Sequence, residues 1–198
     1  MIQIPNRVGT RVLASACILG FGVNYMLAQD SRDNATGPDG ARSRAAIAAQ
    51  DARTRARDAA RRAQKAASTA ADKANAAAGH FSAEVAAELK IDAQITRDAA
   101  EQANRELANA FGAASAKNRA LAKRAREAAE RSAEAAREAL AKVEFSGQQL
   151  HQADEATARQ AAEENRVATE KAATAARNAA KAAQDAWEAE RPKDKRGK

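Results

Sequence analysis

The sequence has few of the residues that build an ordinary globular core. Only 3% of its 198 residues are aromatic, and it contains three prolines and a single cysteine, Cys17. One cysteine cannot form a disulfide within the chain, so no disulfide framework exists and the redox compartment is not indicated. Residues that favour strands are also scarce, which argues against a β-sheet.

Alanine takes their place and fills 60 of the 198 positions. Burying an alanine methyl removes little apolar area from water, and stabilisation scales with that area at roughly 25 cal/mol per Å². Alanine is nevertheless the best helix former, with arginine, lysine and glutamate close behind. The composition therefore predicts an all-α protein of long helices with little burial energy per residue.

The N-terminal segment contains a 17-residue run without charge, Val12–Ala28, which follows Arg7 and Arg11. A transmembrane helix needs about 17–25 apolar residues, so the run is just long enough to span a bilayer. A cleaved secretory signal is the alternative, although Met26 occupies a position where cleavage requires a small residue. A soluble apolar helix is a third interpretation. We predict a basic start and a single uncleaved membrane anchor over residues 1–28.

The orientation of this anchor is weakly specified by its flanking cations. Arg7 and Arg11 lie on one side, while Arg32, Arg42 and Arg44 lie on the other within the range that influences topology. We favour a single-pass membrane protein with its N-terminus inside and its helical region outside. A protein secreted after signal cleavage is the alternative.

One face of the anchor carries small residues at four-residue spacing. Ala16, Gly20 and Asn24 would line this face, where small side chains allow close helix approach and asparagine can form an interhelical hydrogen bond. The pattern indicates a membrane-helix packing face through which the anchor could self-associate, although alanine and glycine are common in any membrane helix. A homo-oligomer could also form through the apolar seams of the later helices.

The remainder of the chain divides at glycines and a proline. Residues 29–40 form a polar linker, and residues 41–190 are helical with breaks at Gly79–Ser82, at Gly112 and at Ser146-Gly147. Pro192 ends the last helix. The expected helices cover about 41–79, 82–111, 113–145 and 148–190, and they are followed by a basic tail at 191–198.

Each expected helix carries apolar or small residues at alternating spacings of three and four, which form a seam for a partner helix. These seams run over Ala45–Ala70, Ala86–Ala114, Ala122–Val143 and Ala168–Ala189. The helices carry net charges of +6, −3, +3 and −3 in chain order. Alternating charge suits antiparallel neighbours, so we predict an up-down bundle or an antiparallel coiled coil. Extended single helices are the alternative.

No catalytic motif is found in the sequence: it lacks GxSxG, GxGxxG, GxxxxGK[ST] and HExxH. Its two histidines, His80 and His151, are too few for a structural zinc site, which usually takes four ligands. We therefore predict a protein that is not an enzyme, with no cofactor, no metal and no small-molecule substrate. Four aromatic residues, Phe81, Phe111, Phe145 and Trp187, lie near predicted helix ends, where we expect them to fill space that alanine leaves.

A basic cluster in the first expected helix is the candidate contact for an anionic polymer, whether cell wall, lipid headgroups or nucleic acid. At 100° per residue these cations spread over the face opposite the alanine seam, where phosphates could reach them. A solvated face that partly pairs with the acidic second helix is the simpler interpretation. The cluster comprises Arg42, Arg44, Arg53, Arg55, Arg57, Arg61, Arg62 and Lys65.

In outline, residues 12–190 resemble membrane-anchored stalk proteins, such as the alanine-rich middle of the TolA envelope protein and phage inner-membrane spanins. The resemblance lies in composition and in the order of anchor and helices; no motif aligns, and TolA's folded C-terminal domain has no counterpart. It implies a helical stalk or bundle with a structural or interaction role at the cell envelope. Two alternatives are a cytosol-facing protein that binds nucleic acid and a stress-protective amphipathic protein that folds on drying or on lipid.

Overall fold

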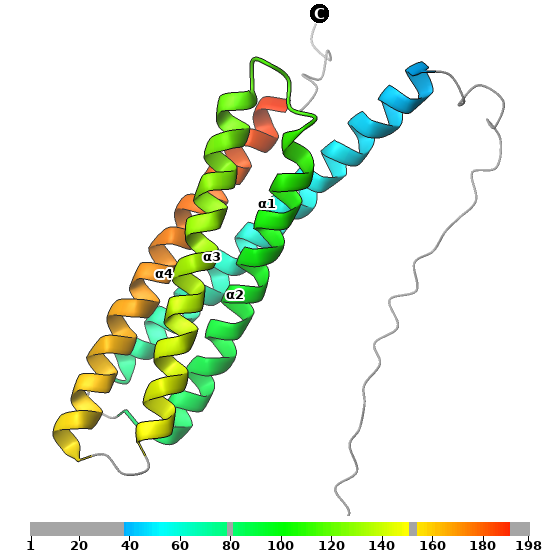
Figure 1. Cartoon of the computed structure of the whole chain (residues 1–198). Helices are drawn as coiled ribbons and strands as arrows, with labels where there is room; N and C mark the ends of the chain where they lie inside the picture. The colour runs from blue at the N-terminus through cyan, green and yellow to red at the C-terminus, as the bar shows by residue number, and fades with distance from the viewer. Residues whose placement is uncertain (1–37, 79–80, 151–153, 191–198) are drawn as a thin grey trace, which may run out of the picture.

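A computed structural model of the chain describes residues 38–78, 81–150 and 154–190, and within these ranges it is helical without strands. Each helix packs against its neighbours in the sequence and α4 packs against α1, whereas α2 and α4 lie diagonally opposite (Figure 1). This is an antiparallel four-helix bundle, so the predicted all-α bundle is confirmed. Its helices are α1 Pro38–Ala76, α2 Ala83–Phe111, α3 Arg119–Gln149 and α4 Glu155–Glu190.

The predicted membrane anchor lies outside the described residues. The run Val12–Ala28 and its packing face at Ala16, Gly20 and Asn24 therefore stay predictions. Among the helices that the structure does describe, none is both long enough and apolar enough to cross a bilayer. His80, His151 and the basic tail also fall outside the described ranges.

Alanine forms most of the core. Every residue of the second predicted seam, from Ala86 to Ala114, is buried, and Leu89 and Val143 are the largest apolar side chains that are fully enclosed. Ala56 and Ala125 have no exposed surface and belong to one cluster with residues of all four helices. Small side chains at these positions let four backbones approach one another closely, as the alternating three- and four-residue spacing requires.

Side-chain hydrogen bonds to backbone N–H groups cap the N-termini of two helices, α2 and α4. The Ser82 hydroxyl accepts a hydrogen bond from the Val85 backbone N–H at 3.4 Å, which caps the N-terminus of α2. The Asp154 carboxylate accepts from the Thr157 backbone N–H at 2.8 Å at the start of α4. Hydrogen bonding to Thr157 holds the pKa of Asp154 below its usual value.

The expected break at Ser146-Gly147 is wrong, because α3 continues through it to Gln149. The Ser146 hydroxyl donates to the Lys142 carbonyl one turn earlier at 2.9 Å and so stays within the helix. Phe145 consequently lies on the outer face of a continuous helix and is 55% exposed, so it does not fill a bundle end. A glycine that follows an apolar pattern is therefore not sufficient evidence for the end of a helix.

Because Gly147 is helical, Gly147→Ala should stabilise the bundle. A Cβ at this position would meet the Ala86 Cβ at 3.6 Å, an ordinary van der Waals contact. Alanine is favoured over glycine inside a helix by about 0.8–1.0 kcal/mol, and thermal unfolding followed by circular dichroism should show a higher melting temperature. Gly112→Ala is the matched control in the α2–α3 turn and should gain less. A lower melting temperature for Gly147→Ala would instead indicate a turn at this position.

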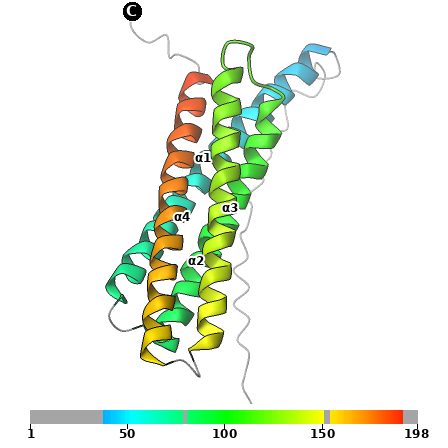
Figure 2. The same cartoon turned by 60° about the vertical axis from the view of Figure 1, so that its left-hand side comes forward.

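The first turns of α1 extend past the other helices. Arg53 already contacts Ala113, beyond the end of α2, so the residues before it have no length of α2 beside them. Residues 41–48 are all exposed, which corrects the expectation that Ala45 belongs to the packed seam. Figures 1 and 2 show the start of α1 splaying away from the bundle at the end that also holds the α2–α3 turn and the end of α4.

Candidate functional surface

The structure leaves six of the eight cations of the predicted basic cluster exposed and places the other two, Arg53 and Arg57, in the packing of the bundle. Arg53 is buried, and its guanidinium donates to the Ala113 carbonyl at 3.2 Å, which corrects the expectation that it faces solvent. Arg57 lies 4.4 Å from the centre of the Trp187 ring and contacts the Asp58 carboxylate at 2.9 Å. Two of the eight cations are therefore part of the packing of the bundle.

Three further cations of the cluster reach across to neighbouring helices. Arg55 binds both carboxylate oxygens of Glu106 on α2, at 3.0 and 3.1 Å. Arg62 donates to the Gln102 side chain on α2 at 3.0 Å, and Arg61 donates to the Gln184 side chain on α4 at 2.9 Å. The partial pairing with the acidic second helix that the sequence indicates thus takes place at Arg55.

The other three cations of the cluster are likewise exposed. Arg42 and Arg44 are exposed on the splayed start of α1, where the Arg44 Nε donates to the Gly40 carbonyl at 3.3 Å. Lys65 is exposed farther along the same helix. Six of the eight predicted contact residues are thus exposed, and their contact with an anionic polymer stays a prediction.

A contact between α1 and α4 was not foreseen from the sequence. The Trp187 indole N–H donates to the Thr54 hydroxyl at 3.3 Å, while the Arg57 guanidinium lies over the ring. Cation–π contacts of this kind contribute about 0.5–1 kcal/mol where they are exposed and more where they are shielded from water. Thr54 and Trp187 are separated by 133 positions in the chain, so no local sequence pattern could predict their contact.

The end of α4 is fastened to the α2–α3 turn. The Glu190 carboxylate accepts hydrogen bonds from the backbone N–H and the hydroxyl of Ser115, both at 3.1 Å, and the Asn118 amide donates to the Ala189 carbonyl at 3.0 Å. Partial burial opposes ionisation of Glu190, but the hydrogen bonds from Ser115 and Asn118 outweigh it and hold the pKa of this carboxyl below its usual value. These hydrogen bonds hold the α2–α3 turn against the end of α4.

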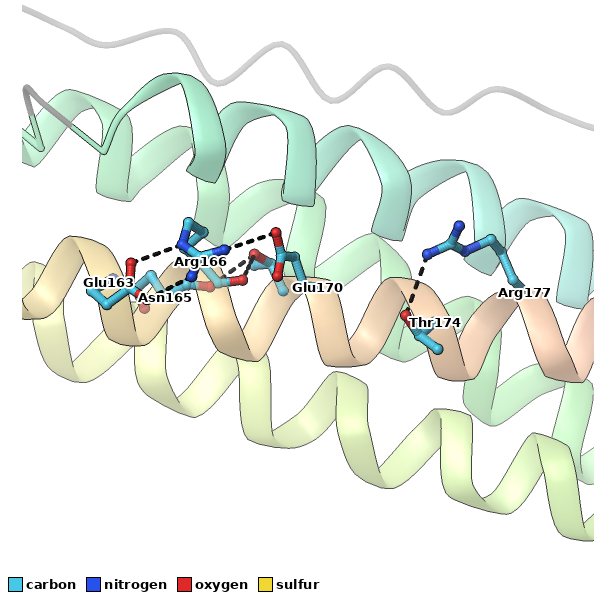
Figure 3. A network of polar contacts seen from close by, with 7 residues as sticks. Glu163, Asn165, Arg166, Glu170, Thr174 and Arg177 are labelled. Carbon is cyan, nitrogen blue, oxygen red and sulfur yellow. Dashed lines mark hydrogen bonds and ion pairs between the residues drawn. The ribbon is translucent and has the colours of Figure 1, made fainter.

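Polar side chains interrupt the alanine core at four fully enclosed positions, Thr96, Ser132, Asn165 and Thr169. The two threonines donate to carbonyls of their own helices, at 2.8 Å in each case. The Asn165 amide and the Ser132 hydroxyl have no hydrogen-bond partner among the described residues. Figure 3 shows Asn165 beside Arg166, whose guanidinium contacts Glu163 at 2.6 Å and Glu170 at 3.0 Å along α4.

Removing the unsatisfied amide should stabilise the protein. Leaving a buried polar group without a partner costs about 1–3 kcal/mol, and Asn165→Ala also improves helix propensity while leaving only a small void. We expect a net gain of about 1–2 kcal/mol in the free energy of unfolding, measured by urea denaturation. Asn178→Ala, at an exposed position of the same helix, controls for propensity. Equal gains from the two variants would show that Asn165 is hydrogen-bonded.

Surface depressions lie between α3 and α4 and are open to solvent. They are lined by side chains of both charge signs, including Arg131, Glu170, Lys181 and Asp185. Within residues 38–78, 81–150 and 154–190, no group of three or more His, Cys, Asp or Glu side chains is placed to hold a metal ion.

The antiparallel fold separates positive and negative charge along the bundle axis. The net charges of the individual helices do not show this separation. The end with the α2–α3 turn carries eleven basic and five acidic residues, and we call it the basic pole. The opposite end, the acidic pole, carries seven basic and twelve acidic residues. The basic pole comprises residues 38–57, 108–126 and 181–190, and the acidic pole comprises 67–78, 83–99, 137–150 and 154–170.

The cations of the two poles differ in their partners. At the acidic pole, Lys73 pairs with Asp92 at 2.8 Å, and Lys90 and Lys142 also bind carboxylates of neighbouring helices. At the basic pole, five exposed cations have no ion-pair partner among the described residues. These five are Lys117, Arg119, Arg124, Arg126 and Lys181.

Comparison of the chain with protein-family models, curated proteins and solved structures finds no match.

Proposed function

We propose that this protein is a non-enzymatic, membrane-anchored helical bundle with a structural or interaction role at the cell envelope. The observation that carries the proposal is the fold's use of alanine: four helices packed around a core that is mostly alanine present a charged outer surface. Such a bundle is suited to hold a position or to contact other macromolecules. The uncharged run Val12–Ala28 supplies the proposed anchor.

Fractionation of full-length protein with a C-terminal tag tests this function. The tag should appear in the membrane fraction and should be removed when protease is added to intact cells or spheroplasts. Leu19→Arg with Val23→Arg should release the protein, because a cation at the centre of a membrane helix costs about 2.5–3.5 kcal/mol. Leu19→Val with Val23→Leu is the conservative control and should leave the protein bound.

Two other results would assign a different function. A membrane-bound tag that protease does not reach would place the bundle in the cytosol and favour the polyanion-binding alternative. Full-length protein that stays entirely in the soluble fraction would overturn the anchored function.

A further inference from the structure

We propose that the basic pole docks on anionic lipid headgroups at the surface of the membrane that holds the N-terminal segment, so that the acidic pole points away from the bilayer. This inference rests on the anchored function proposed above and adds an orientation and a lipid partner to it.

The first argument is where the chain joins the bundle. Residue 37 precedes Pro38, so the whole N-terminal segment connects to α1 at the basic pole. Nine residues separate Ala28 from Pro38, and a fully extended residue spans at most about 3.3–3.6 Å. An anchor ending at Ala28 would therefore keep the start of α1 within about 35 Å of the bilayer. The basic pole is the end of the bundle closest to the membrane.

The second argument is charge complementarity. Lys117, Arg119, Arg124 and Arg126 are exposed, have no ion-pair partner among the described residues, and lie in or just after the α2–α3 turn. No acidic residue occurs between Glu106 and Glu127. Each lysine or arginine near an anionic membrane surface contributes about 1 kcal/mol, which corresponds to roughly fivefold in affinity.

The third argument is the shape of this end. The start of α1 splays away from the axis at the pole that holds the α2–α3 turn, which broadens that end of the bundle (Figure 2). Arg42 and Arg44 are exposed on this splayed portion. A broad, positively charged end can contact a flat anionic surface over a large area. The acidic pole at the far end would be repelled by the same surface.

Distance measurements on full-length protein in vesicles test the orientation. In a Cys17→Ser background, a fluorophore is attached after Ala116→Cys at the basic pole or after Gln149→Cys at the acidic pole; both positions are exposed. The vesicles contain phosphatidylcholine alone or phosphatidylcholine with phosphatidylglycerol, plus a headgroup-linked energy acceptor. We expect transfer from position 116 to be more efficient when phosphatidylglycerol is present, and this increase should be lost at high salt. Position 149 should show little transfer in either vesicle.

Charge removal provides the matched comparison. A variant with Lys117, Arg119, Arg124 and Arg126 changed to Gln should weaken the docking reported by position 116 by about two to three orders of magnitude, because each cation contributes roughly fivefold. The control changes Lys90, Arg97, Lys142 and Arg159 to Gln at the acidic pole and should keep docking intact. Circular dichroism establishes that both variants retain their helices.

The possible results separate this inference from the function on which it rests. Full incorporation into both vesicle types, with equal transfer from positions 116 and 149, would overturn docking while leaving the anchor in place. Failure to incorporate into either vesicle type would overturn the anchored function itself. If duplex DNA displaced position 116 from vesicles containing phosphatidylglycerol, the basic pole would be assigned to nucleic acid and the lipid proposal would be wrong.

Discussion

Leu89→Ala is expected to lower the free energy of unfolding by about 2–5 kcal/mol, a large share of the stability of an ordinary domain. Leu89 has no exposed surface and lies in a cluster with Val143 and two alanines of α1, against which Phe81 and Val85 also pack. A core of methyl groups has few large side chains with which to fill the void. The cavity left by Leu89→Ala would therefore persist, and its cost would add to the lost transfer free energy.

Urea denaturation of Leu89→Ala and of Ile91→Ala tests this expectation. Ile91 lies two residues farther along α2 but is 61% exposed, so its truncation should change the midpoint little. Comparable losses from the two variants would contradict the position of Leu89 in the core. The comparison also tests the phase of α2, because a rotation of the helix would exchange the two residues.

The opposite change should also be harmful. Ala125→Leu adds volume where Ala125 has no exposed surface and shares a cluster with residues of the other three helices. Inserting methylenes into a well-packed core typically costs about 1–3 kcal/mol, because neighbouring backbones must move apart. The alanines around this position have no flexible side chains that could move aside to make room. We therefore expect the loss in the free energy of unfolding to lie at the upper end of this range.

Ala141→Leu is the control for Ala125→Leu, since Ala141 is exposed on the same helix. It should change the stability by no more than about 0.5 kcal/mol in either direction. A more stable Ala125→Leu protein would show that the α3 seam is loosely packed. Thermal unfolding of both variants decides between the two outcomes.

The helices and their buried seams follow from sequence because both depend on local periodicity. Alanine-rich composition favours helix at nearly every described position, and three- and four-residue spacing places Ala86, Leu89 and Ala93 on one face of α2. The Ser82 cap is equally local, since its bond spans three residues. Gly147 shows the limit of such reasoning: glycine disfavours helix, but the packing of α3 against α2 carries the helix through it.

The sequence by itself determined that the described chain is all-helical and which face of α2 is buried, because propensity and periodicity act within a few turns. Only the tertiary structure decided the surface. It buried Arg53, placed Arg57 over Trp187 and separated a basic pole from an acidic pole. Antiparallel packing brings the start of α3 to the same end of the bundle as the start of α1, although many residues separate them in the chain. Charge polarity is a sum over such neighbours, so it exists only once the helices are arranged.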